Sequence, residues 1–250
     1  MGPTHRLNAG PIISRPLKVA AKGNSTSDGC FTVSRRWMTI VFSEISPMGD
    51  VPSSDPEFFD IRYAADRMPW DYGGVPNSLK VFLDEYRGPG RVLIPGCGSG
   101  YEIEAFSSGG WDVIGIDFSK VGVARARRLL GPLADKVCEG DFFTYPLRER
   151  CFDIIYERTF LCALLPDDRP RYAQRITTLI APSGILCGFF FLGPEEEPPP
   201  YPISQDQLDG LLGGWFEKVE DSAVEDSLPL YAGKERWQIW KRKITNHRHC

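Results

Sequence analysis

A glycine-rich loop between a strand pattern and a helix pattern constrains this chain more than any other feature. The buried-strand run 91–95 leads directly into Gly96, Gly98 and Gly100, and we expect a helix over 101–108. Glycine allows positive φ and a close approach of the backbone to a ligand. Tyr101 stands where the dinucleotide fingerprint has a third glycine, and the loop has neither Gly-Lys-Ser/Thr nor Gly-x-Ser-x-Gly. This pattern favours a ligand site and disfavours nicotinamide oxidoreductases, P-loop enzymes and serine hydrolases.

Strand and helix patterns alternate through most of the chain, which predicts an α/β fold with a mostly parallel sheet and helices on both faces. Apolar runs predict strands at 91–95, 111–117, 137–138, 152–156, 185–192, 216–224 and 237–243. Helical periodicity predicts helices at 77–86, 101–108, 119–130, 167–180 and 204–212. The last two strands follow each other without a helix, which indicates an antiparallel C-terminal hairpin. The proline-rich segment 193–202 must be a loop, at the edge of the sheet where ligands bind.

Charge is distributed unevenly along the 250 residues. The chain has a net charge of −4, but residues 1–37 hold six basic side chains against one acidic side chain, so residues 38–250 carry −9. An acidic body is a poor match for a nucleic-acid backbone. We expect a disordered or loosely attached basic leader at 1–37, a linker at 38–54, one catalytic domain at 55–243 and a flexible tail at 244–250. The leader is a targeting peptide, an upstream extension or a plain tail.

The cysteine and histidine content indicates a protein of a reducing compartment that binds no metal. The chain has seven cysteines with no Cys-x-x-Cys pair, and only three histidines. No apolar run reaches the ~18–20 residues of a membrane span. We therefore expect a cytoplasmic protein that binds no metal, nucleic acid or membrane, and we expect it to be a monomer.

Acidic residues at two strand ends fit an adenosine-like ligand. Asp117 ends the second expected strand, 21 residues after Gly96, where a carboxylate can accept both hydroxyls of a ribose. Asp141 and Phe142 follow the third strand, and they can bind the amine and the face of an adenine ring. Cys97 lies in the glycine loop, where a small residue that fills a tight turn is favoured over a reactive thiol.

Four motifs together resemble the thiopurine S-methyltransferase family, and within it the branch of plant and bacterial thiol and halide methyltransferases. The motifs are Pro95-Gly-Cys-Gly-Ser-Gly-Tyr-Glu102, Gly115-Ile-Asp-Phe-Ser119, Asp141-Phe-Phe143 and Phe152-Asp-Ile-Ile-Tyr-Glu-Arg-Thr-Phe-Leu-Cys-Ala-Leu164. The similarity spans about 55–243, and Pro69-Trp70-Asp71-x-Gly73 resembles the family's segment that covers the cofactor. The resemblance implies a Rossmann-like, seven-stranded class I methyltransferase that uses S-adenosylmethionine without a metal.

The same resemblance implies roles for particular residues. Trp70 would pack near the cofactor, Gly96 would lie under its methionine part, Asp117 would bind the ribose, and Asp141 and Phe142 would hold the adenine. Cys97, Gly98, Phe118 and Arg158 complete the implied cofactor site. Phe59 and Tyr63 replace tryptophans of the thiol and halide branch, and Glu157-Arg158 replaces its Asp-Tyr.

The chemistry that the resemblance implies is transfer of a methyl group to a soft nucleophile, sulfur or nitrogen, on a small molecule. Positioning and exclusion of water would be the main contributions of the enzyme, and a thiol needs no strong base. Candidate catalytic residues are Glu157, Arg158 and Asp71, and the expected acceptor pocket consists of Phe59, Tyr63, Trp70, Phe160 and Tyr201. Sulfur acceptors lead, such as thiols and thiopurine-like rings. N-methylation of a planar nitrogen heterocycle in secondary-metabolite or toxin biosynthesis is the alternative, and a non-catalytic adenosine-binding regulator is a more remote one.

Overall fold

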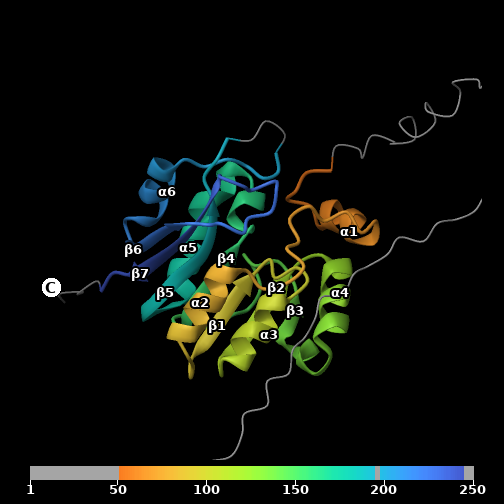
Figure 1. The fold of residues 1–250 in the computed structure, drawn as a ribbon, viewed down its shortest axis with the longest axis horizontal. Helices are drawn as coiled ribbons and strands as arrows, with labels where there is room; N and C mark the ends of the chain where they lie inside the picture. Colours follow the sequence, from red (N-terminus) through yellow and green to blue (C-terminus); the bar gives the residue numbers. More distant parts are fainter. Residues whose placement is uncertain (1–50, 195–197, 245–250) are drawn as a thin grey trace, which may run out of the picture. The chain divides into compact units, whose positions relative to one another are not determined.

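The computed structural model describes residues 51–194 and 198–244, and the basic leader 1–37, most of the linker and nearly all of the tail lie outside them. The described chain forms one seven-stranded sheet with helices on both faces (Figure 1). The strands are β1 (Arg91–Pro95), β2 (Asp112–Asp117), β3 (Val137–Glu139), β4 (Phe152–Arg158), β5 (Ile180–Phe191), β6 (Phe216–Ala223) and β7 (Glu235–Arg242). The α-helices are α1 (Pro56–Ala64), α2 (Asn77–Glu85), α3 (Tyr101–Ser108), α4 (Lys120–Leu130), α5 (Arg169–Leu179) and α6 (Gln205–Leu212). Short 3-10 helices are η1 (Gly131–Lys136), η2 (Leu161–Ala163) and η3 (Pro166–Asp168).

The strand order is β3-β2-β1-β4-β5-β7-β6. The first five strands in this order are parallel, and β7 pairs antiparallel with both β5 and β6. The predicted α/β fold with an antiparallel C-terminal hairpin is therefore confirmed. The chain moves outward from β1 to β2 and β3, then returns to the other side of β1 with β4. This reversal leaves a crevice at the carboxyl ends of β1 and β4, where open α/β sheets bind ligands.

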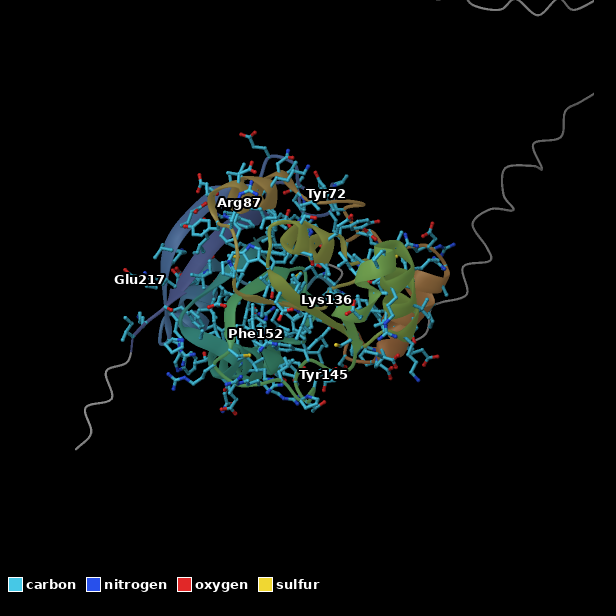
Figure 2. All side chains as sticks on the ribbon, turned by 90° about the horizontal axis from the view of Figure 1, so that it is seen from below. Tyr72, Arg87, Lys136, Tyr145, Phe152 and Glu217 are labelled. Atoms are coloured by element: carbon cyan, nitrogen blue, oxygen red, sulfur yellow. The ribbon has the colours of Figure 1, made fainter. Side chains whose placement is uncertain are left out.

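Alternate residues of the central strands fill two separate cores. Val92 and Ile94 of β1 pack with Leu79, Ile103 and Val123 from α2, α3 and α4 on one face. On the other face, Leu93 packs with residues of α5 and α6. In the view of Figure 2, side chains fill these layers, with Phe152 inside and Glu217 on the outer strand β6. Burial of both faces explains why the central strands are continuous apolar runs.

The predicted boundary between α5 and β5 was wrong. The sequence suggested that Pro182-Ser183-Gly184 separates a helix from a strand starting at 185, but β5 already begins at Ile180. Phe152 pairs with Ile180 while Ile154 pairs with Ile185, so the Pro-Ser-Gly segment lies in a register irregularity of the ladder. A bulge of this kind tolerates proline, because the missing N–H is not needed there.

Candidate active site

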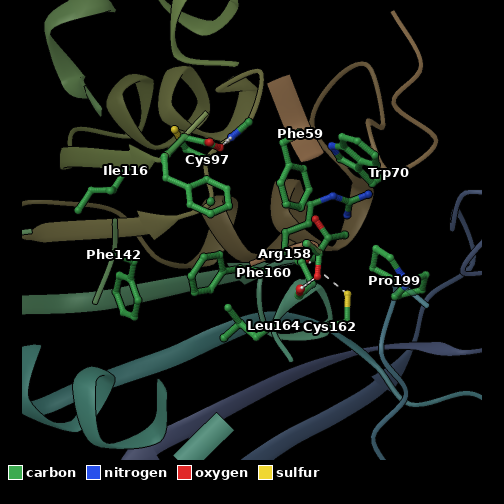
Figure 3. A pocket seen from close by; sticks show the side chains of 18 of the residues that line it. Phe59, Trp70, Cys97, Ile116, Phe142, Arg158, Phe160, Cys162, Leu164 and Pro199 are labelled. Atoms are coloured by element: carbon green, nitrogen blue, oxygen red, sulfur yellow. Dashed lines mark hydrogen bonds between the residues drawn. The ribbon is translucent and has the colours of Figure 1, made fainter. Parts of the chain in front are cut away.

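A cavity of about 980 Å³ lies at the carboxyl ends of β1, β2 and β4 (Figure 3). We call one side of it the glycine-loop end, and its residues are Gly96, Gly98, Asp117, Phe118, Asp141 and Phe142. We call the other side the proline-loop end, and its residues are Trp70, Cys162, Pro199, Leu230 and Tyr231. Phe160 and Arg158 lie between the two ends in Figure 3.

The glycine loop makes its tight turn with left-handed backbone at Gly96 (φ +60°) and Gly98 (φ +52°). A Cβ at Gly96 would lie 2.6 Å from Cδ2 of Phe160, so only glycine fits there. Cys97 is buried, and a Cβ at Gly115 of β2 would lie 2.9 Å from its sulfur. Burial raises the pKa of the Cys97 thiol. The thiol therefore stays protonated and fills space, as predicted for a residue in a tight turn.

Asp117 connects the end of β2 to the glycine loop. Its Oδ2 accepts a hydrogen bond from Gly98 N at 2.9 Å, and its Oδ1 accepts one from Ser119 N at 2.9 Å. The side chain is buried yet lines the cavity, and burial raises its pKa to about 6. Each carboxylate oxygen has a further lone pair, so Asp117 can still accept hydrogen bonds from a ligand.

Asp60 of α1 supports this region, and sequence reasoning missed it. Its Oδ1 accepts hydrogen bonds from Ser119 Oγ at 2.5 Å and from Val121 N at 3.1 Å. Ser119 itself caps α4 by accepting from Gly122 N. Asp60 and Ser119 are 59 residues apart in sequence, so no local sequence pattern predicts their contact.

Asp141 and Phe142 both line the cavity, as predicted. Asp141 Oδ1 accepts from Phe143 N at 2.9 Å, which shapes the loop after β3. Phe142 is buried and meets the Phe160 ring edge-to-face at 5.2 Å between centroids. Asp141 and Phe142 therefore form part of the cavity wall beside Phe160.

The cover segment 69–74 closes the cavity and is fastened to the glycine loop. Asp71 Oδ2 accepts from Ser99 Oγ at 2.5 Å, and its Oδ1 accepts from Gly73 N at 2.8 Å. Trp70 meets Phe59 and Tyr63 edge-to-face, with ring centroids at 5.5 and 5.9 Å. The structure thus brings together three of the predicted aromatic wall residues, with Asp71 held as a structural acceptor beside them.

Tyr201 does not line the cavity within the described part of the chain. Its backbone N–H donates to Cys162 O, which fastens the proline-rich loop to the segment after β4. The preceding residues Pro198, Pro199 and Pro200 form that wall instead, together with Tyr231 from the β6–β7 connection. Sequence reasoning missed Tyr231, because the connection gave no signal of its own beyond its two flanking strands.

Glu157 and Arg158 are adjacent on β4 and point to opposite environments. The Glu157 carboxylate is 1% exposed, hydrogen-bonds within the protein and is not among the cavity-lining residues. Arg158 lines the cavity, with its guanidinium 4.7 Å from the Phe189 ring centroid and 5.2 Å from that of Tyr72. Its Nε lies 3.8 Å from Glu102, and Nη2 has no hydrogen-bond partner among the described residues.

These groups fit S-adenosylmethionine. The left-handed glycines let the backbone approach a ligand, and the Asp117 carboxylate can accept from a ribose diol. Aromatic rings flank the space for a flat base, and a buried cationic donor without a partner can bind a carboxylate. Within residues 51–194 and 198–244, no group of three or more His, Cys, Asp or Glu side chains is placed to hold a metal ion. None of the helices in those ranges has both the length and the apolar character needed to cross a membrane.

Comparisons with known proteins identify the family of this chain. The family described as thiopurine S-methyltransferase matches residues 54–244. A probable thiol methyltransferase 2 from Arabidopsis thaliana is 33% identical over 194 residues, covering 74% of this chain and 84% of that protein. A thiopurine S-methyltransferase from Vibrio cholerae is 26% identical over 212 residues, covering 74% of this chain and 96% of that protein.

A solved structure shows the same fold. It is the Burkholderia thailandensis 1,6-didemethyltoxoflavin-N1-methyltransferase with bound 1,6-didemethyltoxoflavin and S-adenosylhomocysteine. The TM-score is 0.63 at 19% identity, covering 75% of this chain and 87% of that chain. The chain described here therefore belongs to the thiopurine S-methyltransferase family and is an S-adenosylmethionine-dependent methyltransferase.

Proposed function

We propose that this enzyme methylates a sulfur nucleophile on a small molecule that has an apolar or aromatic body. The observation that carries the proposal is the proline-loop end, where Trp70, Cys162 and Tyr231 form an apolar wall beside the Arg158 guanidinium. Such a site suits an apolar body with one electron-rich atom. The names of the relatives, thiol, thiocyanate and thiopurine methyltransferases, support sulfur as the accepting atom.

We assign the glycine-loop end to the cofactor. Asp117 would accept from the ribose hydroxyls, Asp141 from the adenine amine, and Phe118 and Phe142 would enclose the adenine ring. The backbone of Gly96, Cys97 and Gly98 would lie against the methionine part, with Trp70 over it. The cavity of about 980 Å³ is at the upper end of the ~300–1,000 Å³ typical of ligand pockets, which leaves room for cofactor and acceptor together.

We assign Arg158 to an anionic group. A guanidinium keeps its charge at any physiological pH, and its buried Nη2 needs an acceptor. The cofactor carboxylate or a bound thiolate would each satisfy this donor. Bound to the cofactor carboxylate, Arg158 would orient the cofactor; bound to a thiolate, it would favour the ionised acceptor.

The residues of the chain would contribute to the reaction mainly by positioning the acceptor and the cofactor. Bound S-adenosylmethionine supplies a methyl group on a sulfonium sulfur, which leaves as a neutral thioether. Aromatic walls from Phe59, Trp70 and Phe160 would orient the acceptor and exclude water, and alignment at near-attack distance can supply several kcal/mol of the rate enhancement. A thiol with a pKa of about 8.5 is partly ionised at neutral pH, so the site needs no dedicated base.

N-methylation of a planar nitrogen heterocycle is a second candidate function. The ring contacts of Phe59, edge-to-face with Trp70 and tilted against Phe118, favour it, because such walls accept a flat ring. Asp71 is one of the carboxylates on the cavity wall, and it could take a proton from a ring nitrogen.

Labelled S-adenosylmethionine tests both candidates against a thiol panel, a thiopurine-like panel and a panel of nitrogen heterocycles. We expect labelled methyl thioethers from the first two panels. Product from the nitrogen panel alone would replace the sulfur proposal with the second candidate. Calorimetry should show binding of S-adenosylhomocysteine and none of NAD, and the reverse result would refute the cofactor assignment.

We also propose that the enzyme is a cytoplasmic monomer that needs no metal, with one catalytic domain at 55–243. Light scattering at working concentrations should give the mass of one chain, and chelator treatment should leave methyl transfer unchanged.

A further inference from the structure

The turn after β4 contains a residue in an unfavourable backbone conformation. Thr159 has a φ of +60°, in the left-handed region that a β-branched side chain rarely adopts. It lines the cavity and stands directly after Arg158. Strain of this kind persists only where surrounding contacts hold the backbone in place.

Glu157 supplies those contacts. Its Oε1 accepts hydrogen bonds from Phe160 N and Leu161 N, both at 2.9 Å. Its Oε2 accepts one from Tyr172 Oη of α5 at 2.9 Å. A carboxyl group can accept several hydrogen bonds at once, and here they join the residues after Thr159 to β4 and, through Tyr172, to α5.

The turn determines the position of two cavity walls. On one side, the Phe160 ring packs against Gly96 so closely that a Cβ there would lie 2.6 Å from it, and it meets Phe142 at 5.2 Å. On the other side, Arg158 carries the buried guanidinium with its free Nη2. Figure 3 shows Phe160 between Phe142 and Arg158, at the boundary between the two ends of the cavity.

We propose that Glu157 and Tyr172 act as a clamp on the turn 159–161 and so position Phe160 and Arg158 for methyl transfer. Glu157 is then a positioning residue, acting through its neighbours without touching the acceptor. The expected effect on catalysis rests on the proposed function. The hydrogen bonds that form the clamp do not depend on it.

The decisive set of variants is Glu157→Ala, Glu157→Gln and the double variant Glu157→Ala with Thr159→Gly. Glutamine keeps an oxygen for the two backbone N–H groups, so it should retain the turn. Glycine at position 159 adopts a positive φ without a side-chain clash. It should therefore relieve the backbone strain that remains at 159 once Glu157→Ala has removed the supporting hydrogen bonds. Thr177→Val is the matched control. Thr177 lies on α5, the helix that carries Tyr172, and the substitution removes a 2.7 Å hydrogen bond to Ala173 O away from the cavity.

Two readouts apply, and the first does not depend on activity. Amide hydrogen exchange at Phe160 and Leu161 should accelerate at least about tenfold in Glu157→Ala and stay near wild type in Glu157→Gln. The kcat/KM for the acceptor should fall at least about tenfold in Glu157→Ala and recover at least about threefold when Thr159→Gly is added. Thr177→Val should change neither quantity.

Wild-type exchange rates at both amides in Glu157→Ala would overturn the clamp. So would the absence of any recovery in the double variant. If Glu157→Ala does not fold, Tyr172→Phe removes one of the three hydrogen bonds and should show the same two effects at smaller size; wild-type exchange and activity in that variant would also refute the proposal. A wild-type enzyme that methylates nothing would refute the proposed function, while hydrogen exchange would still decide on the clamp.

Discussion

The two ends of the cavity are built in different ways. The glycine-loop end consists of short segments that directly follow β1, β2 and β3, and backbone hydrogen bonds hold its side chains, as between Asp117 and Gly98. The proline-loop end combines residues from the cover segment, the turn after β4, the 198–200 loop and the β6–β7 connection. The first end is set by local structure and the second by tertiary contacts. Changes at the first should therefore affect cofactor binding, and changes at the second should affect the acceptor.

The largest effect is expected from Gly96→Ala. The substitution combines a positive φ with a Cβ 2.6 Å from Phe160, so we expect a loss of about 2–4 kcal/mol in unfolding free energy and a loss of cofactor affinity. Chemical denaturation measures the first and calorimetry the second. Gly110→Ala is the control, because Gly110 has a φ of +88° with no atom near its Cβ position, and it should cost only the backbone strain. Equal losses in the two variants would contradict the close contact at Gly96.

Asp117→Ala should weaken binding of S-adenosylhomocysteine by on the order of 2 kcal/mol or more, since it removes a charged acceptor. The affinity of the wild type should also fall as the pH drops through about 6, the pKa of the buried carboxyl, because the protonated form is a poorer acceptor. Calorimetry across that pH range measures both effects. Unchanged affinity in the variant would remove Asp117 from the cofactor site.

Glu157→Gln should flatten the dependence of stability on pH. Burial raises the pKa of Glu157 to about 7 in the folded protein, while an exposed glutamate titrates near about 4.3. Between these values the folded state holds the proton that the unfolded state has released, so the wild type loses stability as the pH rises through 7. The difference between wild type and variant should change by about 1–3 kcal/mol between pH 4 and pH 8.

Denaturation curves at several pH values test this expectation. A difference that stays constant with pH would show that the Glu157 carboxyl titrates normally. Tyr172 and the Cys162 thiol are the titratable neighbours of the carboxylate, and burial keeps the pKa values of both well above this range.

The smallest effect is expected from Tyr72→Phe at the acceptor side. Tyr72 Oη donates to Asp226 Oδ2 at 2.9 Å, and Asn77 N donates to the same oxygen, so the β6–β7 connection holds the cover segment. Loss of the hydroxyl should raise the acceptor KM about fivefold, on the order of 1 kcal/mol, and leave affinity for S-adenosylhomocysteine unchanged. An equal loss of cofactor affinity would show that the two ends are not separable.

The fold and the glycine-loop end could be predicted because their signals are local. A strand, a turn and a helix that follow one another must place Gly96 at a strand end, and periodicity alone places Asp117 and Asp141 at the next two ends. Asp60 and Tyr231 could not be predicted, because their partners are far away in sequence. Glu157 and Arg158 look equivalent as neighbours on β4, yet the alternation of a strand turns one carboxylate into the core and one guanidinium into the cavity.

The sequence by itself determined the alternating strands and helices of the parallel half, the family and the glycine loop at a strand end, because short-range patterns and backbone geometry suffice for these. Only the tertiary structure decided which aromatic residues line the cavity, that Pro199 and Tyr231 line it where Tyr201 does not, and that Glu157 hydrogen-bonds the residues after Thr159. These outcomes depend on which long-range surfaces pack together, and the packing of a loop against a distant strand leaves no periodic trace in the chain.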